Sequence, residues 1–488
     1  MIILLHPRST RPKNRRFPLS VLALAAVLEG KEEYEIVDGN IDPDPGRTID
    51  TIMSATPAEA LAVSVMPGPQ MVTAVELSKR FRAKYPKVPI IWGGYFPSLY
   101  PDTTLRAPYV DIAVRGQGEE TFQELLEALR NGRDYRHING VSYRDPFGLV
   151  VNTKDRAIRS PGDYPVMPYH RLRDPQKYIA RTFLGTRTAV HHASFGCPFR
   201  CTFCGVTEVA GGRQKSEAPE RTASVLAQLK REFDINAIQF YDNNFFLRED
   251  DAVELAERIT PLDLGWWCEG RIDIINRYSD ATLRTLRKSG CKMIFLGAES
   301  GSDRVLREMD KQITTAQTLE LAARFREFDI IPEFSFVIGN PKAPEEDLRT
   351  DMEFIRKLKK INPISEIIVQ HYTPTPHPDG MYGDIDDKIT FPKTPEEWAT
   401  PRWYNFTVRR DPKLPWLPRK TKRLIDSFET VLQCRWPSIQ DARISRPARA
   451  TLKALSWWRY QLNLYAWPLE LEAAQKVLRP RNPKVESV

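Results

Sequence analysis

The sequence predicts an α/β protein with three parts: a doubly wound parallel sheet, a partial (β/α)6 barrel and a mostly helical C-terminal extension. The chain has 488 residues, a length typical of two or three domains. Strand-like apolar runs alternate with helix-like runs from the first residue to about residue 375, which is typical of parallel α/β layers. Beyond about residue 389 Pro-rich and Trp-rich segments replace this alternation.

The composition narrows the class of protein further. With 41% hydrophobic and 27% charged residues the chain is near the globular average, which excludes disordered, collagen-like and disulfide-scaffold classes. The mean hydropathy is −0.43 and no apolar run reaches about 18 residues, so we expect a cytoplasmic protein. Three of the six cysteines fall within eight positions, which indicates metal ligands that are kept reduced rather than disulfides.

The first block, residues 1–135, contains five short buried strands with helices between them. This pattern favours a doubly wound sheet, which binds ligands at the carboxyl ends of its strands. Residues 136–185 have no clean period and read as a linker with a small hairpin near 138–151. The predicted strands are 1–5, 34–38, 60–65, 89–94 and 110–114.

The second block, residues 186–388, contains six strand–helix units. Six such units make an open or partial barrel, whose working residues should cluster at the carboxyl ends of the strands. The predicted strands are 189–195, 237–242, 265–273, 292–299, 332–338 and 366–372.

The last part, residues 389–488, holds the basic excess of the protein. From residue 401 onward there are 18 Lys and Arg against 7 Asp and Glu, a balance of +11, although the whole chain carries only +8. Six of the ten tryptophans lie in the same segment. This combination favours contact with a membrane surface or another anionic partner, and the alternative is a structural lid that caps the barrel.

The clearest chemical signal is a cysteine cluster directly after the first barrel strand. Cys197, Cys201 and Cys204 form a C-x-x-x-C-x-x-C pattern on a predicted loop. Three thiolates can bind three irons of a [4Fe–4S] cube and leave the fourth iron open for a substrate. A zinc site would need a fourth ligand, for which His191 and His192 are the nearest candidates, and a purely structural cluster is the other alternative.

At these residues the chain resembles the radical S-adenosylmethionine (SAM) superfamily. The resemblance implies that Cys197, Cys201 and Cys204 ligate the cluster and that Phe203 packs beside the adenine of SAM. It further implies a SAM-derived 5′-deoxyadenosyl radical. The Gly-Gly-Glu motif of many members is missing here. The SAM contacts that the resemblance implies lie in the segments after the later strands and are Asp242, Asn243, Arg271, Glu299, Ser300 and Gly339.

Arg271 and Glu299 have a second interpretation. A carboxylate suits the ribose hydroxyls and a guanidinium suits the methionine carboxylate, because charge-assisted hydrogen bonds discriminate these groups. The same two side chains could instead form an ordinary ion pair across the barrel rim.

The first block resembles the Rossmann-like cobalamin-binding domain that precedes the barrel in one large radical SAM class. Glycine-bearing segments follow its strands, and the D-x-H-x-x-G motif of other cobalamin proteins is absent, so no histidine ligand to cobalt is expected. A degenerate domain without ligand is the alternative. The implied cobalamin contacts are Asp38, Ser64, Met66, Gly68, Gly93, Gly94, Tyr95, Gly116, Gly118 and Glu119.

Together the two resemblances imply a cobalamin-dependent radical SAM enzyme that functionalises an unactivated C–H bond. The resemblance covers class B methyltransferases and the anaerobic magnesium-protoporphyrin ester cyclases, so C-methylation of a hydrophobic small molecule is expected and radical cyclisation is the alternative. An RNA-modifying protein is the hypothesis from another class, although residues 1–196 lack the extra cysteines of methylthiotransferases. Expected partners are a one-electron donor such as flavodoxin or ferredoxin and a membrane surface, whereas nucleic acid is not expected.

Overall fold

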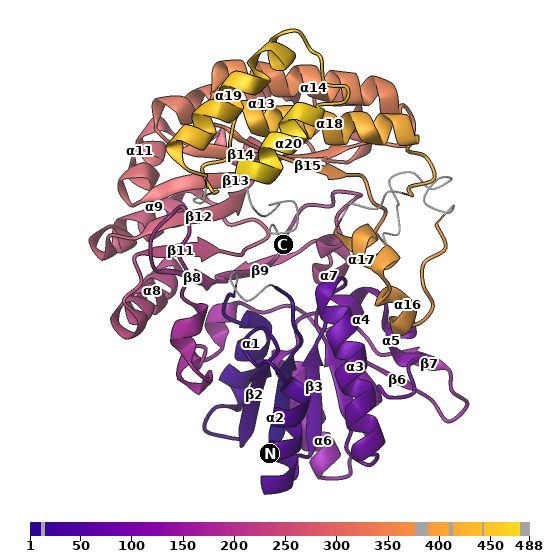
Figure 1. Cartoon of the computed structure of the whole chain (residues 1–488). Coiled ribbons are helices and arrows are strands. Elements are labelled where there is room, and N and C mark those ends of the chain that lie inside the picture. Colours follow the sequence, from indigo (N-terminus) through magenta and orange to yellow (C-terminus); the bar gives the residue numbers. More distant parts are fainter. Residues whose placement is uncertain (11–14, 376–388, 409–412, 442–443, 479–488) are drawn as a thin grey trace.

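The computed structural model describes residues 1–10, 15–375, 389–408, 413–441 and 444–478, and it confirms the predicted fold class. The first sheet has the strand order β2-β1-β3-β4-β5-β6-β7, and its first five strands are parallel. Helices cover both faces of this sheet (Figure 1). The parallel strands are β1 (Ile2–His6), β2 (Tyr34–Asp38), β3 (Ala60–Ser64), β4 (Ile90–Gly93) and β5 (Ile112–Val114). The helices are α1 (Leu19–Leu28), α2 (Pro45–Ala55), α3 (Pro69–Lys84), α4 (Tyr95–Leu99), α5 (Pro101–Leu105) and α6 (Glu119–Arg130).

The expected linker hairpin belongs to this first sheet. Strands β6 (Val141–Arg144) and β7 (Val150–Asn152) form the hairpin, and β6 pairs antiparallel with β5. The sheet therefore continues beyond residue 135. The apolar face of β6 explains this placement, because Val141 is fully buried in the cluster that α1 and α6 share.

The second sheet has the order β15-β14-β13-β12-β11-β8, and all its strands are parallel. Its strands are β8 (Thr188–His191), β11 (Ala237–Phe240), β12 (Gly265–Gly270), β13 (Cys291–Glu299), β14 (Ile331–Ile338) and β15 (Glu366–His371). The larger helices between them are α8 (Pro219–Phe233), α9 (Glu249–Ile259), α11 (Asp280–Lys288), α13 (Thr315–Glu327) and α14 (Pro344–Ile361).

One predicted strand is divided in the structure. The run expected to form a single strand over 189–195 ends at His191, and a second strand, β9 (Ser194–Gly196), leaves the sheet. Strand β9 pairs antiparallel with β10 (Gln214–Ser216), which forms a two-stranded ribbon. The cysteine loop follows β9 and precedes β10 in the chain, so this ribbon flanks it on both sides.

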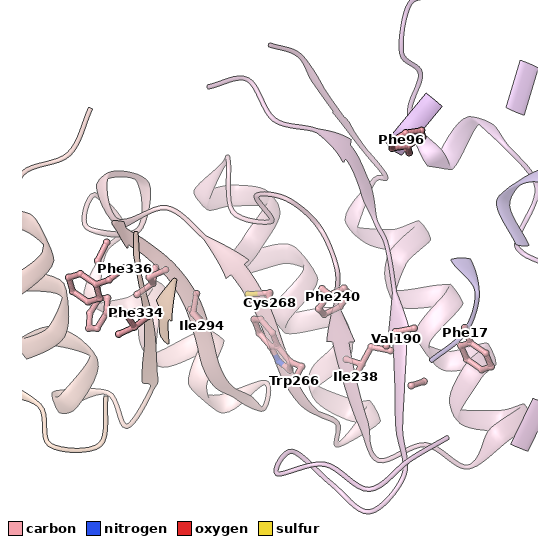
Figure 2. Packing of buried hydrophobic residues seen from close by; sticks show 14 of the residues in the cluster. Phe17, Phe96, Val190, Ile238, Phe240, Trp266, Cys268, Ile294, Phe334 and Phe336 are labelled. Carbon is pink, nitrogen blue, oxygen red and sulfur yellow. The ribbon is translucent and has the colours of Figure 1, made fainter. Parts of the chain in front are cut away.

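Alternate residues of the barrel strands face the helices and the barrel interior. Trp266 and Cys268 of β12 belong to the large core cluster that also contains residues of α9 and α11. Figure 2 shows them in a row with Phe240 and Ile294, beside the helices. Because side chains of a strand alternate between its faces, Trp267 and Glu269 point to the interior.

The C-terminal extension contacts both preceding parts. Helix α16 (Pro395–Trp398) packs on α3, and the Trp398 ring lies 5.5 Å from Phe96. Helix α18 (Arg419–Arg435) packs on α14 of the barrel (Figure 1). The other helices are α17 (Pro401–Thr407), α19 (Arg446–Gln461) and α20 (Leu469–Leu478). No helix in the described ranges is long and apolar enough to cross a membrane.

Candidate functional site

The three cysteines lie on the loop that joins β9 to helix α7 (Val206–Ala210). Gly196 begins the loop with a φ of +85°, and a Cβ there would lie 2.2 Å from the carbonyl oxygen of Arg213. Only glycine therefore fits this turn. Cys201 is buried, whereas Cys197 and Cys204 are partly exposed. The backbone amide of Thr202 donates a 3.1 Å hydrogen bond to the carbonyl of Met309, which holds the loop against the barrel.

Cationic side chains surround the cysteine thiols. Nη1 of Arg271 lies 3.6 Å from Sγ of Cys201, and its guanidinium lies 3.5 Å from the centre of the Phe199 ring. Burial raises the pKa of the Cys197 thiol, and the neighbouring Cys201 adds to this, while Arg271 and Lys311 act in the opposite direction. Nearby cations favour the thiolate, which is the form that binds metals.

The three cysteine thiols fit an iron–sulfur cube better than a single metal ion. Across the described ranges no three His, Cys, Asp or Glu side chains converge on one point. A cube presents a separate iron to each thiolate, so its ligands need not converge. His191, a candidate for the zinc alternative, instead contacts Glu217 with an Nε2 to Oε2 distance of 3.0 Å. Cys197, Cys201 and Cys204 are therefore the residues that would hold a [4Fe–4S] cluster.

A buried ion pair lies beneath the cysteine loop. Glu299 ends β13 with a φ of +60°, a left-handed conformation that non-glycine residues rarely adopt and that often marks functional sites. Its Oε1 lies 2.7 Å from Nζ of Lys311, and both side chains are buried. Burial lowers the pKa of Lys311, but the charges of Glu299 and Cys201 and the hydrogen bond to Glu299 together outweigh burial, so the pKa is raised. Lys311 was missed because its loop carries no sequence signal.

The ion pair between Arg271 and Glu299, which was the alternative to SAM contacts, is absent from the described structure, in which each residue has another charged partner. Nε of Arg271 lies 3.0 Å from Oδ1 of Asp273, while Glu299 contacts Lys311. Both groups remain at the carboxyl ends of neighbouring strands β12 and β13. They are therefore placed where a ligand above the barrel could reach them.

The other residues expected to bind SAM lie in different surroundings. Asp242 is fully buried; it accepts a 2.5 Å hydrogen bond from Ser194 Oγ, and burial raises its pKa. Asn243 beside it is exposed. Ser300 donates to Oδ1 of Asp351 at 2.7 Å, so its hydroxyl supports the backbone after β13. The buried amide of Asn244 has neither polar atom paired in the described structure, and sequence reasoning missed it.

The C-terminal extension covers part of this edge. Nε1 of Trp416 donates to the carbonyl of Gly339 at 3.1 Å, and Gly339 has a φ of +83°. Trp416 also packs against the cluster of apolar side chains that contains Cys201 and Phe203. One tryptophan of the extension therefore caps the barrel edge at the site, as the lid interpretation expected.

Asp38, expected to contact cobalamin, is engaged in an internal network. It accepts hydrogen bonds from the Tyr178 hydroxyl at 2.8 Å and the backbone amide of Asn40 at 2.8 Å, and its Oδ1 lies 3.1 Å from Nδ1 of His6. Nε2 of His6 faces Gln70 at 3.0 Å. Both ring nitrogens of this histidine at the sheet edge thus have partners.

Two glycines near the strand ends of the first sheet have positive φ values. Gly68 and Gly94 have φ values of +91° and +97°, and a Cβ on Gly94 would lie 3.2 Å from the Val65 backbone. Ser64 donates to Ser20, and Met66 is 46% exposed at this edge. The missing side chains of Gly68 and Gly94 let Thr407 and the Val65 backbone approach closely, and Met66 places an exposed thioether at the same edge.

The other residues expected to contact cobalamin lie in different surroundings along this edge of the sheet. Tyr95 lies beside the cysteine loop, because a Cβ on Gly205 would be 2.1 Å from its hydroxyl, whereas Gly93 ends β4 and pairs with Val114 of β5. Gly116 donates its amide to Ser98 at 2.8 Å and so lies in the same region. Glu119 follows Gly118 at the start of α6 and lines a cavity of about 30 Å³ with His191 and Glu217, where burial raises its pKa.

Two family models match the chain. The model of the B12 binding domain matches residues 10–126, and the model of the Radical SAM superfamily matches residues 193–355. The two matches follow each other in the same order as the two sheets. They confirm both resemblances that the sequence predicted.

Individual proteins agree with these matches. An uncharacterised methyltransferase from Pyrococcus horikoshii is 29% identical over 70% of this chain and 73% of its own length. The anaerobic magnesium-protoporphyrin IX monomethyl ester cyclase of Synechocystis sp. is 23% identical over 93% of this chain and 89% of its own. The solved structure of the radical SAM methyltransferase TsrM from Kitasatospora setae covers 98% of both chains with a TM-score of 0.68 at 16% identity, a likeness of fold.

The fold, the cysteine loop and both family matches lead to one assignment. The chain is a radical SAM enzyme with an N-terminal B12-binding domain, similar to cobalamin-dependent methyltransferases, and its cofactors are a [4Fe–4S] cluster, SAM and cobalamin.

Proposed function

We propose that this enzyme transfers a methyl group to an unactivated carbon of a small molecule with a hydrophobic body. The observation that carries the proposal is the contact between the two candidate sites. Tyr95, the first residue of α4, lies against Gly205, which directly follows Cys204. Helices α4 and α7 meet at the same place (Figure 1). One substrate at this junction could reach both cofactors.

The chain's own residues have distinct roles in this proposal. Cys197, Cys201 and Cys204 hold the cluster, and Arg271 keeps a positive charge beside Cys201. The remaining candidates at the barrel edge position SAM. When bound, the cluster, SAM and cobalamin supply the radical and the methyl group. A one-electron donor such as flavodoxin or ferredoxin would reduce the cluster.

The proposal of a substrate with a hydrophobic body is supported by the side chains of the barrel interior and by the name of a similar protein. Trp267 and Phe295 face the interior at a ring separation of 6.3 Å. A curated relative is named a cyclase of a protoporphyrin ester, a large hydrophobic pigment. That similarity spans 93% of the chain, so radical cyclisation is the second candidate.

The test is an anaerobic incubation of reconstituted enzyme with cobalamin, reductant, cell extract and SAM that carries a trideuterated methyl group. A new product heavier by one trideuteromethyl group supports methylation. A product that has lost hydrogen and gained no label favours cyclisation. Protein that never forms 5′-deoxyadenosine under these conditions would contradict the radical mechanism.

Cobalamin coordination offers an independent test. Because His6 is already paired with Asp38 and Gln70, we propose that no protein histidine binds cobalt. The electron paramagnetic resonance spectrum of bound cob(II)alamin should then lack nitrogen superhyperfine splitting from a histidine. A spectrum with that splitting would contradict the proposed coordination, and failure to bind cobalamin would favour a degenerate domain.

We further propose that the exposed apolar side chains of α19, of α20 and of the segment between them contact an anionic membrane. These side chains form the α19–α20 apolar surface. Leu455, Trp458 and Leu462 are spaced three and four positions apart and so share one face of the helix. The segment from residue 401 onward carries a charge of +11, which complements anionic headgroups. The exposed side chains that define this surface are Leu455, Trp457, Trp458, Leu462, Leu464, Trp467 and Leu469.

A further inference from the structure

A carboxylate faces the barrel interior below the cysteine loop. Trp267 and Glu269 of β12 and Arg271, directly after this strand, occupy alternate positions, while Trp266 and Cys268 pack against the outer helices (Figure 2). Arg271 reaches Sγ of Cys201 at 3.6 Å. Two residues of a strand span about 6.6 Å, so Glu269 lies roughly that far below the arginine, inside the barrel.

Aromatic rings surround this position. Glu269 pairs in register with Phe295 on β13, whose ring lies 6.3 Å from that of Trp267. The ring of Tyr241, after β11, lies 6.2 Å from Trp267 at an interplanar angle of 87°. Tyr241 is 40% exposed, and Glu269 and Phe295 are partly exposed, so a ligand in the barrel could contact these three side chains.

Glu269 differs from the other charged groups of the described interior in its surroundings. Within the described residues no hydrogen bond or ion pair reaches its carboxylate. Glu333 on β14, by contrast, accepts from Nε1 of Trp267 at 2.8 Å and from Gln440. The cations above, Arg271 and Lys311, are paired with acidic partners.

The carboxylates near Glu269 favour a positively charged ligand. Burial first, and then the charges of Glu333 and Asp242, raise the pKa of Glu269 to about 8, so the neighbouring carboxylates repel a negative charge at this position. A cation would relieve this repulsion and would also be attracted by the faces of the neighbouring rings.

We propose that Glu269, together with Trp267, Tyr241 and Phe295, binds a positively charged nitrogen group of the substrate. This inference rests on the proposed function and narrows its substrate class to amphiphilic molecules that carry an amine or quaternary ammonium group. The aromatic rings contact the body of that group, and the carboxylate neutralises its charge.

A matched pair of probes tests this recognition without catalysis. Choline and 3,3-dimethylbutan-1-ol have the same shape and differ in the charge of one atom. Binding of each is followed by broadening of its methyl proton signal, above the pKa of about 8 for Glu269. SAM is present and reductant absent, so the SAM site is filled and no turnover occurs.

The wild-type protein should bind choline about tenfold more tightly than the neutral probe, as expected for a partly desolvated cation beside aromatic rings and a carboxylate. Glu269→Gln should remove this preference, and Trp267→Leu should reduce it. Glu254→Gln, on the exposed face of α9, should retain it. Melting curves identify any variant that fails to fold.

Equal binding of both probes to folded wild-type protein would overturn the inference, as would an unchanged preference in folded Glu269→Gln. The same preparation is then reduced and assayed for 5′-deoxyadenosine. Choline binding without SAM cleavage would refute the proposed function and leave the cation site in place. SAM cleavage without a choline preference would refute only the cation site.

Discussion

Nζ of Lys311 lies 2.7 Å from Oε1 of Glu299, and this buried pair supports the underside of the cysteine loop. Gly297 makes the close approach feasible, because a Cβ there would lie 2.1 Å from Oε1 of Glu299 and 2.5 Å from Nζ of Lys311. The charges of the pair are withdrawn from water, so each depends on the other for stability.

Lys311→Met should therefore destabilise the barrel by about 3–5 kcal/mol, because it leaves the carboxylate of Glu299 buried and unpaired. Denaturant unfolding measures this change. Lys177→Met, which removes an exposed pair with Asp174, should cost at most about 1 kcal/mol. The double variant Lys311→Met with Glu299→Gln should recover part of the loss, and a Lys311→Met protein as stable as wild type would contradict the account.

Cys201→Ala should abolish cluster formation. The reconstituted wild-type protein should contain about four irons and four sulfides per chain, and loss of the buried central thiolate removes one of three ligands. Chemical iron and sulfide analysis provides the measurement. Cys434→Ala, in helix α18, is the matched control and should retain full iron content. Full iron and SAM cleavage in Cys201→Ala would show that the ligands are elsewhere.

Much of the fold could be predicted because its signals are local. Buried parallel strands such as 2–6 and 60–64 read as continuous apolar runs, and the cysteine spacing lies within eight positions. The partnership of Glu299 with Lys311 depends on how a loop folds back beneath β13, which no periodicity encodes.

Contacts between residues that are far apart in the sequence could not be predicted either. Trp416 reaches the carbonyl of Gly339 across 77 positions of sequence, and the hairpin β6–β7 joins the first sheet although its segment resembles a linker. The engagement of Asp38 by Tyr178 likewise depends on tertiary contact. The sequence therefore indicated which strand ends matter but not which side chains there are already paired within the protein.

Thermal stability should depend on pH through the two interior glutamates. Burial first, and neighbouring carboxylates second, raise the pKa of Glu269 to about 8, and burial raises that of Glu333 to about 7. The folded protein therefore holds these protons more tightly than the unfolded chain, whose glutamates titrate near 4.5. Their stabilising contribution is complete below about pH 4.5 and is lost as the pH rises to about 8.

In the Glu269→Gln variant the side chain at this position is neutral at every pH. The variant should therefore not show the part of the stability loss that Glu269 causes in the wild type. Its Tm minus that of the wild type should increase from about pH 5 to about pH 8 and then stay constant. Glu254→Gln, on the protein surface, should show no such trend. A Tm difference for Glu269→Gln that is the same at every pH would contradict a raised pKa.

The α19–α20 apolar surface should bring the enzyme to anionic vesicles. Trp457 is 55% exposed and Leu462 is 64% exposed, and Arg423 and Arg459 lie over the rings of Trp467 and Trp458. Each Lys or Arg near an anionic surface contributes about 1 kcal/mol, and indole rings settle at headgroup depth. The protein should therefore float with vesicles that contain anionic lipid and stay behind with neutral ones.

The double variant Trp457→Ser with Leu462→Ser should lose most of this flotation while its melting curve is unchanged. The control is Phe147→Ser with Leu149→Ser, which removes two side chains that are 89% and 66% exposed at the β6–β7 hairpin. If exposed apolar area alone drove binding, both double variants would lose it equally. Loss confined to the first variant identifies the basic, Trp-rich face as the contact, whereas recovery of wild-type protein in the soluble fraction with both lipids would reduce the extension to a lid.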